Sequence, residues 1–183
     1  MTADRKSGRH GMWLGMMGLS LLCSFAVQSA DNLHFRGALV AEPCVIPPGE
    51  ENIQLDFGTV IDKYLYLNQR TRGQQFAIHL AECDLTLGST GVRITFRGNE
   101  NLSLPGLLAL DAASQASGIA IGIEAADGKP LPLNHAGHQY PLAKGSNLMV
   151  FKAYVEGEPE ALANKTIQRG PFNAVATFSL DYE

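Results

Sequence analysis

The sequence predicts an all-β, sandwich-like fold, and three observations support this prediction. About eight short stretches alternate apolar and polar residues with period two, which is the pattern of a strand with one buried face. Glycine, proline, asparagine and aspartate separate these stretches, and none of them keeps a helical period. A chain of 183 residues with 17% charged residues suits one globular domain with a short appendage.

The first thirty residues have the pattern of a cleaved secretory signal. A positive start, formed by Arg5, Lys6 and Arg9, precedes an apolar stretch over residues 12–27. Ser29 and Ala30 supply small residues for cleavage, and both positions stay open as the cleavage site. The alternative is an uncleaved membrane anchor, but the apolar stretch is short for a full span. We therefore expect residues 1–30 to be removed on export.

The charge balance bears on the class of partner. The whole chain has a formal net charge of −4. Residues 1–30 carry a net charge of +2, so that the remainder carries −6. An acidic protein of this kind is unsuited to the phosphate backbone, and we expect no nucleic acid among its partners.

The cysteine count predicts one disulfide. Cys23 lies inside the signal, which leaves Cys44 and Cys83 as an even pair in an exported chain. A disulfide is the default for such a pair outside the cytosol. The alternative is a metal site, which two isolated thiols without a neighbouring histidine do not favour.

The first half of the chain after the signal contains four predicted strands. The first covers Asn32 to Val40 and has a glycine, Gly37, on its apolar side. A glycine there is typical of a place where another backbone comes close. The next three stretches are bounded by turns or glycines and cover residues 53–57, 76–83 and 92–96. Residues 64–73 are polar and basic and predict a loop.

The second half contains the remaining elements. Residues 107–110 predict a short strand, and residues 119–123 and 131–133 around Asp127-Gly128 predict a hairpin. A loop is expected over residues 134–145, a strand over 148–155 and one helical turn over 161–166.

The last stretch, residues 170–183, alternates up to the end of the sequence. Its apolar positions fall on one side of an extended backbone, namely Phe172, Ala174, Ala176, Phe178, Leu180 and Tyr182. Val175 is the one apolar residue on the other side. One interpretation is simply the last strand of a sandwich. The pattern also raises the question of what pairs with the edges of such a strand.

The sequence contains no catalytic signature, and we expect no enzyme, no metal and no cofactor. It lacks a nucleophile elbow, a glycine-rich phosphate loop and a His-Glu-x-x-His motif. His135 and His138 lie in a predicted loop that Gly137 makes unsuitable for a helical metal site. An acidic run at residues 156–160 has no aspartate-rich calcium loop around it and predicts a solvated surface.

Several motifs, in order, give the chain a specific resemblance. The opening Asp-Asn-Leu-His-Phe-Arg-Gly-Ala-Leu at residues 31–39 resembles the N-terminal extension of a pilin. The stretch from Phe76 to Cys83, with Cys44, resembles the disulfide pair of that family. Residues 170–182, with Gly170 and the penultimate tyrosine, resemble its C-terminal β-zipper motif. The chain after the signal is thus similar to the pilin subunits of bacterial chaperone–usher pili, and the opening resembles minor or adaptor subunits of P-type pili.

The resemblance implies a fold and a mechanism. Pilin domains are immunoglobulin-like sandwiches that lack their final strand and are completed by a donor strand from a chaperone or a neighbouring subunit. It implies a donor-strand extension at residues 31–41 and a pilin domain at residues 42–183. The implied donor residues are Leu33, Phe35, Gly37 and Leu39. The implied chaperone-binding and groove residues are Gly170, Phe172, Ala174, Ala176, Phe178, Leu180 and Tyr182.

The implied function is that of a structural pilus subunit that polymerises by donor-strand exchange and supports cell adhesion. The implied partners are a periplasmic chaperone, an outer-membrane usher and neighbouring pilins in head-to-tail order. The implied route is export through the periplasm into a fimbrium at the cell surface. The alternative function is a secreted sugar-binding or adhesin module with an immunoglobulin-like fold.

Overall fold

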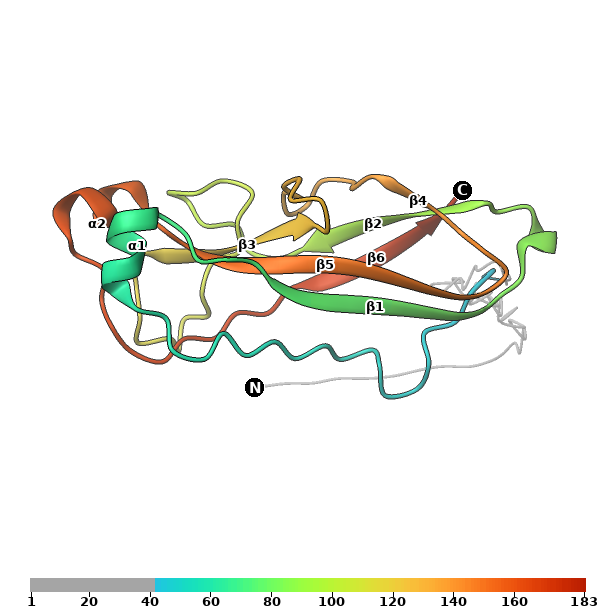
Figure 1. The fold of residues 1–183 in the computed structure, drawn as a ribbon, viewed down its shortest axis with the longest axis horizontal. Coiled ribbons are helices and arrows are strands. Elements are labelled where there is room, and N and C mark those ends of the chain that lie inside the picture. The colour runs from blue at the N-terminus through green and yellow to red at the C-terminus, as the bar shows by residue number, and fades with distance from the viewer. Residues whose placement is uncertain (1–41) are drawn as a thin grey trace, which may run out of the picture. The chain divides into compact units, whose positions relative to one another are not determined.

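The computed structural model describes residues 42–183, which fold into two antiparallel sheets of three strands each (Figure 1). The prediction of an all-β sandwich is therefore confirmed. The predicted signal at residues 1–30 and the predicted donor strand at residues 31–41 lie outside the described residues. Within residues 42–183, no helix is both long enough and apolar enough to cross a membrane.

The first sheet has the order β1-β5-β3, with β5 (Gly145–Gly157) between β1 (Gln74–Cys83) and β3 (Ile119–Ala125). Phe151 of β5 lies opposite Phe76 of β1, and the neighbouring residues of β5 pair with β3 on its other side. All three strands were predicted at these places. β5 is longer than predicted, because its pairing continues as far as the flanking glycines.

The second sheet has the order β4-β2-β6, with β2 (Gly91–Arg97) between β4 (Gln139–Pro141) and β6 (Thr177–Tyr182). The strand predicted over residues 92–96 is confirmed. The loop predicted over residues 134–145 is wrong at β4. This strand has only three residues, which are too few to show an alternation in the sequence. β4 exists because its residues pair with the first three residues of β2.

The core lies between the two sheets. Fully or almost fully buried side chains from β1, β2 and β5 meet there, including Ile78, Leu80, Val92, Ile94 and Phe151. The rings of Phe96 and Phe151 approach edge to face at 5.3 Å between centroids. Each such side chain stabilises the fold by about 1.5–3 kcal/mol through its burial. The apolar side chains at alternate positions of these strands therefore hold the two sheets together.

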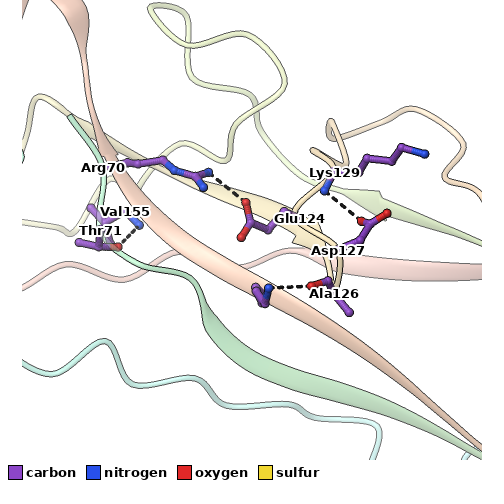
Figure 2. A network of polar contacts seen from close by, with 8 residues as sticks. Arg70, Thr71, Glu124, Ala126, Asp127, Lys129 and Val155 are labelled. Carbon is purple, nitrogen blue, oxygen red and sulfur yellow. Dashed lines mark hydrogen bonds and ion pairs between the residues drawn. The ribbon is translucent and has the colours of Figure 1, made fainter. Parts of the chain in front are cut away.

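The outer face of the first sheet is also covered, which its alternation did not predict. The Tyr154 ring packs directly over Gly122 of β3, and the Arg70 guanidinium stacks on that ring at 4.1 Å from its centroid. Arg70 Nη1 donates to Glu124 Oε2 at 3.0 Å (Figure 2). Because this outer layer covers β3, all seven of its residues are buried, Glu124 among them.

The hairpin predicted around Asp127-Gly128 forms only in part. The turn closes with a backbone hydrogen bond from Ala125 N to Lys129 O at 2.8 Å. Beyond the turn, pairing is reduced to an isolated bridge between Glu124 and Pro130. Pro130 and Pro132 have no N–H group, so that a regular ladder cannot continue there. The short strand predicted over residues 107–110 is likewise reduced to isolated bridges of Leu108.

Two short helices lie at one end of the sandwich (Figure 1). The helical turn predicted over residues 161–166 is confirmed as α2 (Pro159–Asn164). The loop predicted over residues 64–73 is wrong, because α1 (Asp62–Asn68) forms there. Only Leu65 of α1 is buried, in a small cluster with Ile119 and Val155, and one buried residue leaves no helical period to recognise.

The predicted disulfide is present. Cys44 and Cys83 are joined and almost fully buried, with exposed fractions of 2% and 3%. Backbone hydrogen bonds from Val45 to Ala81 and from Asp84 to Pro43 flank the bond on both sides. The disulfide therefore ties the beginning of the described chain to the end of β1.

Candidate functional site: an open groove between two unpaired segments

Two extended segments of the domain lack strand partners. Residues 51–60 were predicted to contain a strand, but none of them makes a backbone–backbone hydrogen bond to another residue of the described range 42–183. The same holds for residues 174–176, which precede β6. Figure 1 shows the first segment leading into α1 and the second leading from α2 into β6. Within residues 42–183 the strand predicted over residues 53–57 is therefore not formed, although Leu55 and Phe57 are half-buried as its alternation predicts.

The terminal stretch keeps the alternation that the sequence predicted. Its six apolar positions from Phe172 to Tyr182 are all half-buried and pack against the core. Val175, on the other side, is 70% exposed. The regular strand begins only at Thr177, where pairing with Arg97 of β2 starts. Within residues 42–183, β6 pairs with β2 alone, so that its other edge is open.

The residues before β6 are held by hydrogen bonds to the loop around residues 111–115. Pro171 O accepts a hydrogen bond from Gln115 N at 2.9 Å, and Asn173 O accepts one from Asp111 N at 2.8 Å. Asn173 N donates to Ser114 Oγ at 3.0 Å. This loop positions the terminal stretch and leaves its other edge facing residues 51–60.

A groove lies between the two segments and opens onto the core. Its walls come from residues 51–60 on one side and residues 170–178 on the other. The deeper part is a cavity of about 450 Å³, and its floor consists of core side chains from both sheets, including Phe76, Phe96, Ile121, Ile123 and Ala153. These floor side chains are themselves largely buried, with Phe96 and Ala153 at 5% and Ile121 and Ile123 at 8% exposed, so that the groove is a gap in the packing beside the core. The cavity therefore has the volume and the apolar lining that a row of apolar side chains would fill.

The two ends of the groove differ. At the end near α1, the rings of Phe57 and Phe172 approach to 6.2 Å between centroids across the groove. At the other end, Glu183 fixes the end of β6, since its backbone pairs with Gly91 and its carboxylate accepts two hydrogen bonds from Arg93 Nη2 at 2.8 and 3.0 Å. Burial, and secondarily the Glu42 carboxylate, raise the pKa of the Tyr182 phenol, which stays neutral at physiological pH.

This arrangement can bind a strand. An extended segment laid in the groove meets backbone N–H and C=O groups that have no backbone partner within residues 42–183, and apolar side chains on the floor. Alternate side chains of such a segment, two residues apart, point into the cavity. Within residues 42–183, no three side chains of His, Cys, Asp or Glu come together as metal ligands would. The groove thus has the extended shape and the apolar lining that a strand of polypeptide requires.

The structure places most of the groove residues that the resemblance implies along one wall. Gly170, Phe172, Ala174 and Ala176 line the groove, and Phe178 reaches its floor. Leu180 and Tyr182 pack against the core beyond it. The implied donor residues Leu33, Phe35, Gly37 and Leu39 lie outside the described residues. Residues 51–60 were missed as the second wall, although their alternation ending at Gly58 was the available signal.

Comparisons with known proteins agree with this geometry. The profile of the family described as "Fimbrial protein" matches residues 33–183. The Fimbria A protein of Serratia marcescens is 31% identical over 166 residues, which cover 91% of this chain and 92% of the relative. The Fimbrial adapter PapK of Escherichia coli is 32% identical over 158 residues, which cover 84% of this chain and 88% of the relative.

The fold is also found among solved structures. The crystal structure of the P pilus rod subunit PapA superposes with a TM-score of 0.67 and covers 78% of this chain and 100% of that one. At 24% sequence identity, this likeness concerns the fold alone. The family match and the relatives at 31% and 32% identity concern the sequence itself. Together they show that the chain belongs to the fimbrial protein family of chaperone–usher pilins and is a structural pilus subunit.

Proposed function

We propose that this subunit polymerises by strand exchange: its groove takes a strand from another chain, and its own residues 31–41 fill the groove of a neighbour. One observation supports this above all, namely that a groove with two unpaired edges opens onto the core. An uncovered core beside a bare edge is an aggregation hazard unless another chain covers it. An added strand supplies hydrogen-bond partners to the backbone groups of both walls at once.

The lengths of donor and groove match. The apolar positions from Leu33 to Leu39 and the groove positions from Phe172 to Phe178 cover equal numbers of residues. In extended backbone each set covers about 20 Å. Gly37 gives the donor one position without a side chain, where its backbone can approach the groove closely.

The donor in this proposal runs antiparallel to β6. Residues 51–60 run towards α1, whereas the terminal stretch runs away from it (Figure 1). A donor antiparallel to β6, as β2 is, leaves the groove at the α1 end. The donor subunit then lies beyond that end, while the acceptor's own residues 31–41 leave from the opposite end. Such a head-to-tail contact does not close on itself and produces a filament.

The remaining parts of the proposal follow from the sequence and the family. The signal at residues 1–30 directs export, a periplasmic chaperone covers the groove first, and an outer-membrane usher exchanges it for the next subunit. The product is a fimbrium at the cell surface that supports adhesion, and the subunit itself is no enzyme. We place the subunit among the minor or adaptor pilins, because its Asn-Leu-His-Phe-Arg-Gly opening resembles theirs and PapK is a relative.

Two adjacent substitutions test the groove. A synthetic peptide of residues 31–41 is expected to raise the melting temperature of the mature subunit, since a ligand at a hundredfold excess over its Kd stabilises by about 2.7 kcal/mol. Ala176→Glu places a carboxylate on the groove wall and is expected to weaken peptide binding at least about tenfold, because that carboxylate is desolvated when the peptide binds. Calorimetric titration measures both effects.

The matched control is Thr177→Glu. Thr177 is exposed and lies opposite Arg97, so that the same carboxylate is tolerated there and leaves peptide binding unchanged. Equal losses of binding in both variants would contradict the proposed groove. So would a subunit whose melting temperature does not respond to the peptide at all.

A further inference from the structure

The end of the domain that carries α1 presents an apolar surface to solvent. Ile61, Tyr64 and Leu67 are spaced three residues apart and are 58%, 40% and 84% exposed. Residues at this spacing are neighbours on a helix surface. These three side chains do not contribute to the core, since Leu65 is the residue of α1 that packs in the interior.

Basic side chains lie next to Leu67, at one side of this apolar surface. A hollow of about 770 Å³ between α1 and residues 165–169 is lined by three basic side chains, Lys63, Lys165 and Arg169, and by one carboxylate, Asp62. Arg169 Nη2 donates to Asp62 Oδ2 at 2.6 Å, which leaves the two lysines without a carboxylate partner among the residues that line the hollow. We call these residues, with Ile61, Tyr64 and Leu67, the α1 pole. Basic side chains thus outnumber carboxylates in the lining of the hollow, although Glu160 of the neighbouring helix α2 is exposed at the same end of the domain.

The opposite end of the domain is acidic. Glu42, Glu82 and Asp84 are all exposed and surround the Cys44–Cys83 disulfide. The backbone hydrogen bond from Asp84 N to Pro43 O, at 2.7 Å, holds Asp84 next to the residue that follows Glu42. Lys144 is the cation near Asp84. We call Glu42, Glu82 and Asp84 the acidic root, because Glu42 directly follows the proposed donor strand, residues 31–41.

A donor strand bound in the groove brings the acidic root of one copy near the α1 pole of another. The walls of the groove end at Val60 and Gly170. The ion-paired Asp62 lies two residues after Val60, and its partner Arg169 directly precedes Gly170. A donor that leaves at this end carries Glu42 three residues beyond Leu39, about 10 Å along extended backbone. The acidic root of the donor subunit therefore arrives at the α1 pole of the acceptor.

We propose that the α1 pole is a docking surface for the acidic root of the next copy in the filament. This inference rests on the proposed strand exchange and adds a second contact to it. Opposite charges at such a contact favour the correct encounter and direction of insertion, and a donor of the wrong polarity brings its acidic root to the acidic end of the acceptor. Covering Leu67 and Tyr64 in the same contact removes apolar surface from water.

Two peptides and two acceptors test the charge contact. The peptides comprise residues 31–42 with an amidated end and carry either the native Glu42 or Glu42→Lys. The acceptors are the mature subunit and its Lys63→Glu/Lys165→Glu variant, in which both altered side chains are exposed. Calorimetric titration gives the four affinities at each of two salt concentrations, about 0.05 M and about 0.5 M NaCl, since salt screens such a contact.

On the native subunit at low salt, the native peptide is expected to bind about threefold to fivefold more tightly than the Glu42→Lys peptide. The order reverses on the charge-reversed acceptor, and both differences shrink at high salt. Equal affinities of the two peptides on the native acceptor would overturn the inference while leaving the groove intact, because both peptides still bind. Binding of neither peptide would defeat the strand exchange itself, and this inference with it. Unchanged melting temperature of the variant serves as the folding control.

Discussion

Replacement of Cys44 by serine is expected to lower the free energy of unfolding by about 4 kcal/mol. The disulfide closes a loop with a sequence separation of 39, and in the chain-entropy model such a loop stabilises by about that amount. Both sulfurs are buried, so that a serine also leaves a polar hydroxyl inside the core. Urea unfolding of the purified subunit, with and without the substitution, measures the loss.

The control for this prediction is the native subunit under reducing conditions, which breaks the same bond without the hydroxyl. A loss of similar size in both experiments assigns the effect to the cross-link. Stability that is unchanged in both would contradict the role given to the disulfide. The bond also holds the chain next to the proposed donor strand, so that we expect lower yields of assembled subunits from the Cys44→Ser variant.

Gly37→Arg is expected to abolish donation while leaving the subunit folded. In the proposed register residue 37 faces the groove, and a guanidinium there must enter an apolar cavity without a partner. A free-energy loss of about 2.7 kcal/mol or more corresponds to at least a hundredfold weaker donor. Competition between a Gly37→Arg peptide of residues 31–41 and the native peptide measures this loss directly.

Ala38→Arg is the matched control, because residue 38 lies on the opposite side of the donor strand. Its side chain points away from the groove, and we expect affinity close to that of the native peptide. Equal binding of the Gly37→Arg and native peptides would contradict the donor register. Equal losses of affinity from both substitutions would mean that residue 37 does not lie closer to the groove than residue 38.

The alternation of residues 170–183 was enough to predict an extended segment with one buried face. Every apolar position from Phe172 to Tyr182 is half-buried, and the exception that the sequence marked, Val175, is exposed. The period of two comes from the local geometry of an extended backbone, so that a short stretch of sequence is enough to recognise it. Whether a strand has partners depends on distant residues. The alternation of Ile53, Leu55 and Phe57 therefore gave no sign that residues 51–60 lack a partner within the described domain.

The misses have the same physical origin. α1 forms over two turns because Leu65 reaches a cluster with Ile119 and Val155, far away in the sequence. The rest of that helix faces solvent and gives no helical period. β3 is buried on both faces because Arg70 and Tyr154 cover it from outside. Both depend on tertiary contacts that local patterns do not contain.

Hydrogen exchange tests most directly whether this domain is one strand short. In the subunit freed of any partner, the backbone amides of residues 51–60 and 174–176 are predicted to exchange rapidly, because they have no backbone partner within residues 42–183. Addition of the 31–41 peptide is predicted to slow both segments together, and to leave β2 and β5 as they were. Segments already protected without the peptide, or unprotected in its presence, would contradict the account.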